Sequence, residues 1–283
     1  MNGLALCAGV GGLELGLSIA CPGYRAVCVV EGEVYSAATL ARRMEDGFLE
    51  PAPIYSDVRT FDGRPWRGVV DIISAGYPCQ PFSTAGLGKG VDDPRHLWPE
   101  IARIVAETAP PLVFCENVPP HLSIGFDQVA SDIGGMGYRV AAGVFSACAV
   151  GAPHLRERLF WLALADSGGD ELRDIAERGE RTSQAAEQGD SEPGDDGAAE
   201  LLADAESSHA RQHCNPAGDR HGPPLPEHIR PMLVEGGWWG AEPSVGRVAD
   251  GVAHRVDRLR AIGNGVVPAV AARAFVTLLG ELI

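Results

Sequence analysis

The first 165 residues alternate between short apolar segments and segments of helical composition, and this alternation constrains the fold more than any other feature. Apolar segments of strand length cover residues 4–7, 25–30, 69–74, 112–115, 138–146 and 159–165. Segments of helical composition cover residues 13–20, 34–45, 94–107 and 127–136. This order predicts an α/β fold with a parallel, doubly wound sheet. Ligands of such sheets bind beyond the carboxyl ends of the strands, so the motifs that follow the strands form the candidate site.

The chain changes character after residue 165. Residues 166–230 are rich in Gly, Asp, Glu, Ser and Pro, which is typical of a flexible insertion or a small, loosely packed lobe. Residues 166–206 hold fourteen acidic residues and three arginines, a net charge of −11, so the other 242 residues carry −4 of the total of −15. An apolar helix is predicted from about residue 267. We expect a main domain over 1–165, an acidic low-complexity insertion over 166–245, and a C-terminal segment over 246–283 that returns to the main domain.

Cysteine usage and hydropathy exclude several classes of protein. The seven cysteines are scattered without a C-x-x-C pair, which argues against a zinc site and against a secreted disulfide framework. No run of eighteen apolar residues occurs, so we expect no membrane span, and the first residues do not resemble a signal peptide. We therefore expect a cytoplasmic protein without a bound metal. The acidic total alone argues against a nucleic-acid partner, but most of that charge lies in one segment.

A glycine-rich turn, Gly9-Val-Gly11-Gly12, follows the first predicted strand. Glycines let a backbone approach a ligand closely, and the helix behind them presents free N–H groups. The sixth position of a G-x-G-x-x-G fingerprint is Glu14 here, so a nucleoside cofactor without a pyrophosphate fits better than a dinucleotide. Glu31, after the second strand, is a candidate for binding ribose hydroxyls. The alternative is an ordinary turn between strand and helix with a solvated Glu.

The octapeptide GYPCQPFS, residues 76–83, follows the third predicted strand and places Cys79 between two prolines. A cysteine at a strand end becomes a nucleophile when nearby positive charge lowers the pKa of its thiol. The glycine-rich residues after Ser83 are typical of a mobile loop that closes over a substrate. The alternative is a buried, inert cysteine, which describes the other six cysteines well.

Charged residues follow two later strands of the predicted sheet. Glu116 comes at the end of the segment 112–115, at the sheet edge expected for Cys79, where a partly desolvated carboxyl group can keep a proton. Arg156 and Arg158 precede the segment 159–165, and side chains two residues apart in an extended segment point to one face. They could bind phosphate or a base carbonyl. The alternatives are a helix-capping Glu116 or Asn117 and a solvated edge strand.

Together and in this order, the motifs ALCAGVGG, GYPCQPFS, ENV, PHLRERLF and RAIGNGVVP resemble those of the DNA cytosine-5 methyltransferases, over residues 1–165 and about 245–283. The resemblance implies a Rossmann-like class I S-adenosylmethionine-dependent methyltransferase sheet with a small target-recognition insertion. It implies S-adenosylmethionine as cofactor. The residues it assigns to the cofactor are Gly9, Gly11, Gly12, Glu31, the pair Asp57 and Val58 at the adenine, and Asn264.

The resemblance also implies a reaction on double-stranded DNA. The target cytosine leaves the stack, because its C6 cannot be reached inside the duplex, and Cys79 attacks that carbon. Glu116 binds N3 and the exocyclic amine, Arg158 binds O2, and Arg156 positions the loop or the backbone. Gln80 and Ser83 belong to the substrate loop.

This sequence departs from the family pattern at several positions. Ala5 and Cys7 stand where many members have Asp and Phe, His154 stands where Gln is usual, and Gly265 where Ser is common. The family places target recognition in residues 166–245, which are acidic here and would be repelled by phosphate. We therefore expect recognition by a smaller element near Trp238, Trp239 and Arg247, or by loops of the main domain, with the acidic part disordered or directed away from DNA.

Two other functions compete with DNA methylation. Cytosine methylation of tRNA belongs to a related branch of the family, but the Cys-Phe-Thr signature of that branch is absent from this sequence. A methyltransferase fold without activity that only binds a partner is the second, and retention of Cys79, Glu116, Arg156 and Arg158 argues against it. We expect a monomer of bacterial or bacteriophage type, acting within a restriction–modification system, with a cognate restriction endonuclease as a candidate partner, or as an orphan enzyme.

Overall fold

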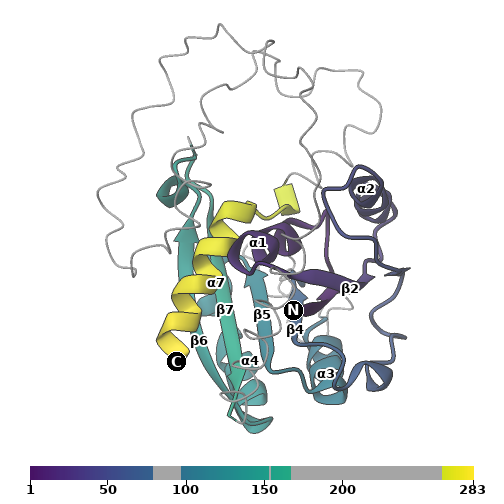
Figure 1. The fold of residues 1–283 in the computed structure, drawn as a ribbon. Helices are drawn as coiled ribbons and strands as arrows, with labels where there is room; N and C mark the ends of the chain where they lie inside the picture. The colour runs from purple at the N-terminus through teal and green to yellow at the C-terminus, as the bar shows by residue number, and fades with distance from the viewer. Residues whose placement is uncertain (79–96, 153, 167–262) are drawn as a thin grey trace, which may run out of the picture.

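A computed structural model describes residues 1–78, 97–152, 154–166 and 263–283, and these residues form a seven-stranded sheet with helices on both faces (Figure 1). The strands are β1 (Asn2–Leu6), β2 (Arg25–Val30), β3 (Ile54–Tyr55), β4 (Ile72–Ala75), β5 (Leu112–Asn117), β6 (Tyr138–Ser146) and β7 (Glu157–Ala165). The helices are α1 (Gly12–Ala20), α2 (Val34–Glu45), α3 (Trp98–Thr108), α4 (Phe126–Gly135) and α7 (Pro268–Leu282). Short 3₁₀ helices are η1 (Arg64–Trp66), η4 (Pro119–Leu122) and η5 (Cys148–Val150). The predicted α/β class is confirmed.

The sheet is mixed rather than wholly parallel as predicted. The strand order is β3-β2-β1-β4-β5-β7-β6, and β7 runs antiparallel to both β5 and β6. The connection between β6 and β7 covers only residues 147–156 and contains η5. A parallel partner needs a crossover of a dozen or more residues that returns the chain to the same edge, whereas a short connection reverses the chain direction. The strand that carries Arg158 therefore runs opposite to β5, which carries Glu116.

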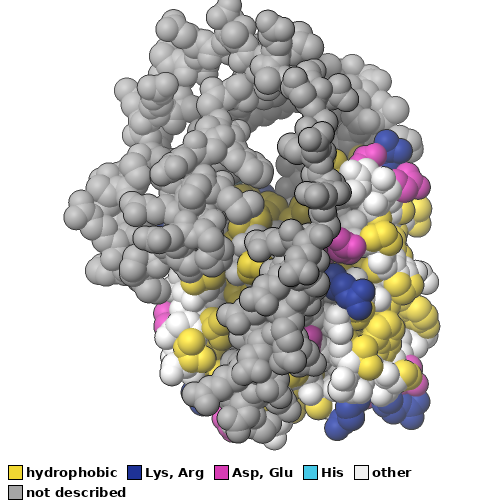
Figure 2. Space-filling view, in the orientation of Figure 1, with side chains coloured by type: hydrophobic (Ala, Val, Ile, Leu, Met, Phe, Trp, Pro, Cys, Tyr) yellow, Lys and Arg dark blue, Asp and Glu magenta, His cyan; other side chains and the backbone are white. Residues whose placement is uncertain are grey.

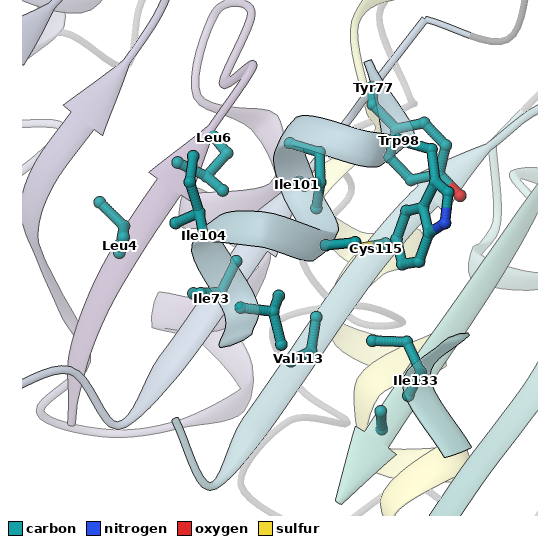
Figure 3. Close-up of a cluster of buried hydrophobic side chains, with 14 of the residues drawn as sticks. Leu4, Leu6, Ile73, Tyr77, Trp98, Ile101, Ile104, Val113, Cys115 and Ile133 are labelled. Atoms are coloured by element: carbon teal, nitrogen blue, oxygen red, sulfur yellow. The ribbon is translucent and has the colours of Figure 1, made fainter. Parts of the chain in front are cut away.

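Two hydrophobic cores hold the helices against the sheet. On one face α3 and α4 cover side chains such as Leu4, Ile73 and Val113, and Figure 3 shows Ile101 and Ile104 of α3 above them. On the other face α1 and α7 cover Ile72, Phe114 and Phe160, and α2 packs beside them through Leu40. Strand residues alternate between the two faces, because successive side chains of a strand point in opposite directions. The doubly wound arrangement follows.

The C-terminal helix α7 packs beside α1, as Figure 1 shows. A Cβ atom at Gly16 of α1 would lie 2.6 Å from the Cβ of Ala271, so the two helices meet closely at this glycine. The carbonyl of Leu282 accepts a hydrogen bond from Arg139 Nη1 at 2.6 Å, which fixes the end of α7 against β6. The last described segment of the chain is thus part of the layer that covers the sheet. The predicted insertion over 166–245 lies outside the described residues, except for Asp166.

Neither a membrane-spanning helix nor a group of metal-ligating side chains occurs in the described residues. None of the helices in the described ranges is long and apolar enough to cross a membrane. The same ranges contain no group of three His, Cys, Asp or Glu side chains that could hold a metal ion. On the face shown in Figure 2, charged side chains of both signs are mixed with hydrophobic ones.

Candidate functional site

A cavity of about 560 Å³ opens at the carboxyl ends of β1, β2 and β4. Its size is in the range of small-molecule and cofactor sites. Its walls come from the turn after β1, the segments after β2, β3 and β4, the residue before α3, the end of β5 and the segment before α7. The lining residues include Cys7, Gly9, Gly12, Glu31, Glu33, Asp57, Val58, Arg59, Gly76, Pro78, Leu97, Glu116, Asn264 and Val266. The structure therefore brings most of the residues predicted from the motifs to one place.

The glycine-rich turn shapes the cavity through its backbone. Gly11 is the N-cap of α1 with a φ of 83°, a left-handed conformation that favours glycine, and it is not among the lining residues given for the cavity. A Cβ atom at Gly12 would lie 2.6 Å from the carbonyl oxygen of Val266, so only glycine lets the C-terminal segment approach the turn. The fingerprint position filled by Glu14 faces the sheet, where Glu14 is buried. Gly12 thus serves the close approach of one backbone segment to another.

Glu31 follows β2 and holds the rim of the cavity. Its carboxylate accepts hydrogen bonds from the backbone N–H of Gly9 at 2.7 Å and of Glu33 at 2.8 Å. Burial raises the pKa of this carboxyl above its ordinary value, while the two N–H donors oppose that rise. A carboxylate fixed in this way beside a glycine turn can accept hydrogen bonds from neighbouring hydroxyl groups of a ligand.

The loop after β3, which neighbours the loop after β2, supplies further polar residues of the cavity wall. Asp57 and Val58 both line the cavity. Arg103 of α3 holds this loop, because its guanidinium donates to the carbonyls of Val58 at 3.0 Å and Phe61 at 2.9 Å. Glu107 in turn accepts from Arg103 at 3.0 Å. Arg103 was not identified from the sequence motifs, since the loop carbonyls to which it donates lie more than forty residues away in the chain.

Cys7, Arg59 and Leu97 are among the lining residues that were not predicted as site residues from the sequence. Cys7, at the end of β1, has a φ of 50° and its thiol has a pKa raised to about 12, chiefly by burial. Arg59 lies 3.6 Å from Asp57 across the loop after β3. Leu97 precedes α3 and closes one side of the cavity. Of these three residues, only Cys7 stood out in the sequence, because it departs from the family pattern in the first motif.

Glu116 and Arg158 meet where β5 and β7 lie side by side. Arg158 Nε lies 3.0 Å from Glu116 Oε1, and both side chains are largely buried. Burial raises the pKa of Glu116 to about 7, although Arg158 and Arg156 act to lower it. Near neutral pH a considerable fraction of this carboxyl therefore carries a proton that it can donate. Glu116 also lines the cavity, so the acid predicted at this sheet edge faces the same space as the glycine-rich turn.

Arg156 connects the start of β7 to the segment before α7. Its Nη2 donates to the carbonyl of Gly263 at 2.7 Å and also to that of Gly265. Arg158 reaches the same Gly263 carbonyl at 3.4 Å, so both arginines point to one face, as their spacing predicts. Asn264, between the two glycines, lines the cavity. Burial and the charge of Arg158 lower the pKa of the Arg156 guanidinium from its ordinary value.

Three predicted residues of the substrate loop, Cys79, Gln80 and Ser83, lie outside the described residues, as do Trp238, Trp239 and Arg247. The first described segment of the chain ends at Pro78, which lines the cavity together with Gly76. Pro78 immediately precedes Cys79 in the chain. The backbone that leads to the thiol thus lies beside the cavity and beside Glu116.

The lining residues suit a nucleoside-type cofactor. Glu31 and Asp57 both line the cavity, and no Cβ atom intrudes at Gly9, where no atom lies within 4 Å of the position it would take. Hydroxyl and amino groups of a ribose and a base are donors that such carboxylates accept. The turn beside these carboxylates lacks the third glycine of the dinucleotide fingerprint, because Glu14 stands at that position.

Comparison with known proteins agrees with these observations. The family model for C-5 cytosine-specific DNA methylases matches residues 1–214 of the 283. Type II methyltransferase M.NgoMIV of Neisseria gonorrhoeae is 35% identical over 165 residues, which cover 57% of this chain and 51% of that protein. Type II methyltransferase M.Eco47II of Escherichia coli is 32% identical over 173 residues, covering 59% of this chain and 40% of that protein. This chain thus spans about half, or less, of the length of these curated relatives.

Among solved structures, the S. pombe Dnmt2 methyltransferase aligns with 59% of this chain and 51% of its own, at 21% identity and a TM-score of 0.49. The assignment to a family depends on the sequence matches. Since the matched region covers most of the chain, including the cavity turn, Glu116 and the two arginines, the chain belongs to the C-5 cytosine-specific DNA methylase family.

Proposed function

We propose that this protein transfers a methyl group from S-adenosylmethionine to C5 of cytosine in double-stranded DNA. The observation that carries the proposal is the position of Glu116, which is paired with the largely buried Arg158, on the wall of the cofactor-sized cavity. Gly76 and Pro78, which lead to Cys79, line the same cavity. An acid, a cation and the approach to a thiol are thus gathered where a ligand of nucleoside size fits.

S-adenosylmethionine, when bound, supplies a methyl group on a sulfonium, which is an electrophile. Gly9, Gly11 and Gly12 form the turn against which it would lie, and Glu31 would accept hydrogen bonds from its ribose. Asp57 and Val58 would contact the adenine, and Asn264 would complete the wall from the C-terminal side. Arg156 serves this site indirectly, because its hydrogen bonds fix the carbonyls on either side of Asn264.

The chain's own residues would carry the reaction on a cytosine flipped out of the duplex. The thiolate of Cys79 forms a bond to C6 while Glu116 gives its proton to N3 and Arg158 holds O2. Addition of the thiolate shifts the electron pair of the C5–C6 double bond and makes C5 a nucleophile, which would accept the methyl group that the bound cofactor supplies. Loss of the C5 proton to a base and expulsion of Cys79 from C6 restore the ring, and Glu116 recovers the N3 proton. Gln80 and Ser83 would contact the substrate from the same loop.

The biological setting follows from the same proposal. The relatives are named Type II methyltransferases, so we propose a modification enzyme acting on double-stranded DNA in a restriction–modification system. A cognate restriction endonuclease, a monomeric state, a cytoplasmic location and a bacteriophage origin stay predictions from the sequence. The target sequence would be read by residues outside the described ranges or by loops around the cavity.

The proposal is tested by methyl transfer from tritiated S-adenosylmethionine to duplex DNA and, in a parallel reaction, to total tRNA. We expect transfer to DNA alone, none with Cys79→Ala, and a loss of about 10²–10⁴-fold with Glu116→Gln, which cannot donate the proton. Duplexes containing 5-fluorocytosine add a second readout. A fluorine at C5 cannot be removed by a base as the C5 proton can, so the covalent adduct between Cys79 and C6 persists.

Each contrary outcome selects one of the alternatives. Labelled tRNA in place of DNA would identify the RNA-modifying branch. Binding of S-adenosylmethionine without transfer to either nucleic acid, at low salt and high enzyme concentration, would identify a fold without activity. Transfer by the Cys79→Ala variant at the wild-type rate would rule out the covalent mechanism.

A further inference from the structure

A buried hydrogen-bonded pair, Tyr77 and His121, lies beneath the site and has no part in the mechanism described above. Tyr77 is 4% exposed and His121 is 1% exposed. The hydroxyl of Tyr77 lies 3.1 Å from Nε2 of His121, and Nδ1 of His121 lies 3.0 Å from the carbonyl oxygen of Ile124. A carbonyl only accepts, so we assign the ring hydrogen to Nδ1, and Nε2 of the neutral ring then accepts from the Tyr77 hydroxyl.

The pair joins the two segments that carry the reacting groups. Tyr77 stands two residues before Cys79, and His121 lies in η4, five residues after Glu116. A second contact runs beside the first, since Asn117 Nδ2 donates to the carbonyl of Tyr77 at 3.3 Å. One side-chain and one main-chain hydrogen bond therefore tie the approach to the thiol to the segment that follows the acid.

The contacts of Tyr77 with His121 and Asn117 lie just beyond the end of the β4–β5 ladder. The last residue pair of the β4–β5 ladder is Ala75 with Cys115, so beyond it the two strands share no ladder hydrogen bond in the described residues. Without the ladder, the separation of the two segments depends on side chains. The Tyr77 and Asn117 contacts thus hold the outgoing backbones of β4 and β5 together after the ladder has ended.

Aromatic rings surround the pair and restrict its movement. The Tyr77 ring lies 5.7 Å from that of Trp98, which Figure 3 shows beside it, and 5.8 Å from the His121 imidazole in an edge-to-face arrangement. Phe126 lies 6.1 Å from His121 on the other side. Rings packed at these distances favour defined orientations, so the hydroxyl and the imidazole meet in a fixed geometry.

We propose that Tyr77 and His121 are positioning residues for methyl transfer: their hydrogen bond sets the position of Cys79 relative to Glu116, so that addition to C6 and proton delivery to N3 occur on one ring. This inference rests on the proposed function. It predicts a specific effect on the chemical step, because a misplacement of about 1 Å between reacting groups can cost about 100-fold in rate. Cofactor binding is not affected, since neither residue is among those that line the cavity.

The test compares Tyr77→Phe, His121→Leu and the double variant with the wild-type protein in single-turnover methyl transfer, S-adenosylmethionine binding and urea unfolding. We expect Tyr77→Phe to slow the single-turnover rate by about 10-fold or more, with the cofactor dissociation constant changed by less than about twofold. The double variant recovers part of the stability lost by each single variant, because the Tyr77 hydroxyl and Nε2 of His121 are removed together, although the carbonyl of Ile124 loses its donor. It does not recover the rate, because the tie between the two segments is still missing.

Tyr138→Phe is the matched control. Tyr138 is also buried and its hydroxyl donates to the carbonyl of Pro110 at 2.7 Å, but it begins β6 at the opposite edge of the sheet. It loses the same kind of hydrogen bond far from the site, so we expect lower stability with an unchanged rate.

The proposal is overturned if Tyr77→Phe keeps the wild-type rate, if Tyr138→Phe slows the reaction equally, or if the double variant regains rate together with stability. Each of these results would make the pair an ordinary part of the core. Failure of the proposed function looks different, because the wild-type protein itself would then transfer no methyl group to DNA, and the positioning role would be rejected with it.

Discussion

At the scale of single residues, the described structure buries a carboxyl group that takes no part in the proposed reaction. Glu14 of α1 is 1% exposed, and its Oε1 accepts a hydrogen bond from the hydroxyl of Ser74 on β4 at 2.8 Å. Its Oε2 has no hydrogen-bond partner among the described residues. Burial raises the pKa of Glu14 from 4.5 to about 7. The helix behind the cofactor turn thus carries a carboxyl group that favours its neutral form.

We expect this carboxyl to make the protein less stable as the pH rises. Below pH 4.5 it is protonated in both the folded and the unfolded chain, so it imposes no electrostatic penalty. Between pH 4.5 and about 7 the unfolded chain releases the proton while the folded chain keeps it, and the free energy of unfolding falls by about 3 kcal/mol. Glu14→Gln has no proton to lose, so its stability advantage over the wild-type protein should grow by that amount between pH 5 and pH 8.

Urea unfolding at the two pH values measures this difference. Glu45→Gln is a suitable control, because the Glu45 side chain is 68% exposed and its removal changes no buried charge. Parallel pH profiles for Glu14→Gln and the wild-type protein would show that Glu14 ionises as readily in the folded chain as in the unfolded one. Glu116 and Glu31 also have raised pKa values, so they contribute to the pH dependence of the wild-type protein. The difference between the wild-type protein and Glu14→Gln isolates the contribution of Glu14.

At the scale of elements, the cavity depends on how β7 meets the segment before α7. The guanidinium of Arg156 donates from one nitrogen, Nη2, to two carbonyls that flank Asn264, and a lysine side chain differs from it in length and shape. We expect Arg156→Met to weaken S-adenosylmethionine binding by about 10-fold or more, because hydrogen bonds from charged donors are each worth about 1.5–3 kcal/mol. Arg156→Lys should recover only part of this affinity.

Isothermal titration with S-adenosylmethionine measures the effect. Arg139→Met provides the comparison, since Arg139 also donates to a carbonyl of the C-terminal segment, that of Leu282, but at the far end of α7. Equal affinities of Arg156→Met and the wild-type protein would mean that Asn264 keeps its place without Arg156. A loss shared by Arg139→Met would point to general loosening of α7 rather than to the cavity.

The elements also show which parts of the fold could be predicted from sequence patterns. Strands β2 and β6 and helix α2 have the predicted bounds, because each combines a clear composition with a clear boundary signal. The direction of β7 was predicted wrongly, although the short connection from β6 contained the information. Strand β3 was not predicted, since two residues are too few to show an alternation.

The candidate site was predictable where one residue type has one chemical role at a strand end, as for Glu31 and Glu116. It was not predictable where partners are distant in the chain, as for Tyr77 and His121, which are separated by 44 residues and are joined only by the packing of two loops. Gly11 is a third case. It was predicted to contact the cofactor, but a glycine is required there by the left-handed N-cap of α1, and Gly11 is not among the residues that line the cavity.

At the scale of the whole molecule, the cavity is assembled from both ends of the chain. Gly12 near the start contacts Val266 near the end, and α7 then covers the sheet through Phe275, whose ring lies 5.4 Å from that of Phe114 on β5. Phe275 is 2% exposed and lies in the core shared by α1, α7 and the strands. The family model ends at residue 214, so this closing helix lies beyond the part of the chain that it matches.

We expect the packing of α7 to stabilise the fold and the cofactor site together. Phe275→Ala should lower the free energy of unfolding by about 3–5 kcal/mol, because a buried aromatic side chain is removed and a cavity remains. Affinity for S-adenosylmethionine should fall with it, since α7 carries the segment that contacts Gly12. Glu281→Ala, on the exposed side of the same helix, should change stability by less than about 0.5 kcal/mol. A Phe275→Ala protein as stable as the wild type would show that α7 is an appendage, and that residues 1–166 build the sheet and its cavity without it.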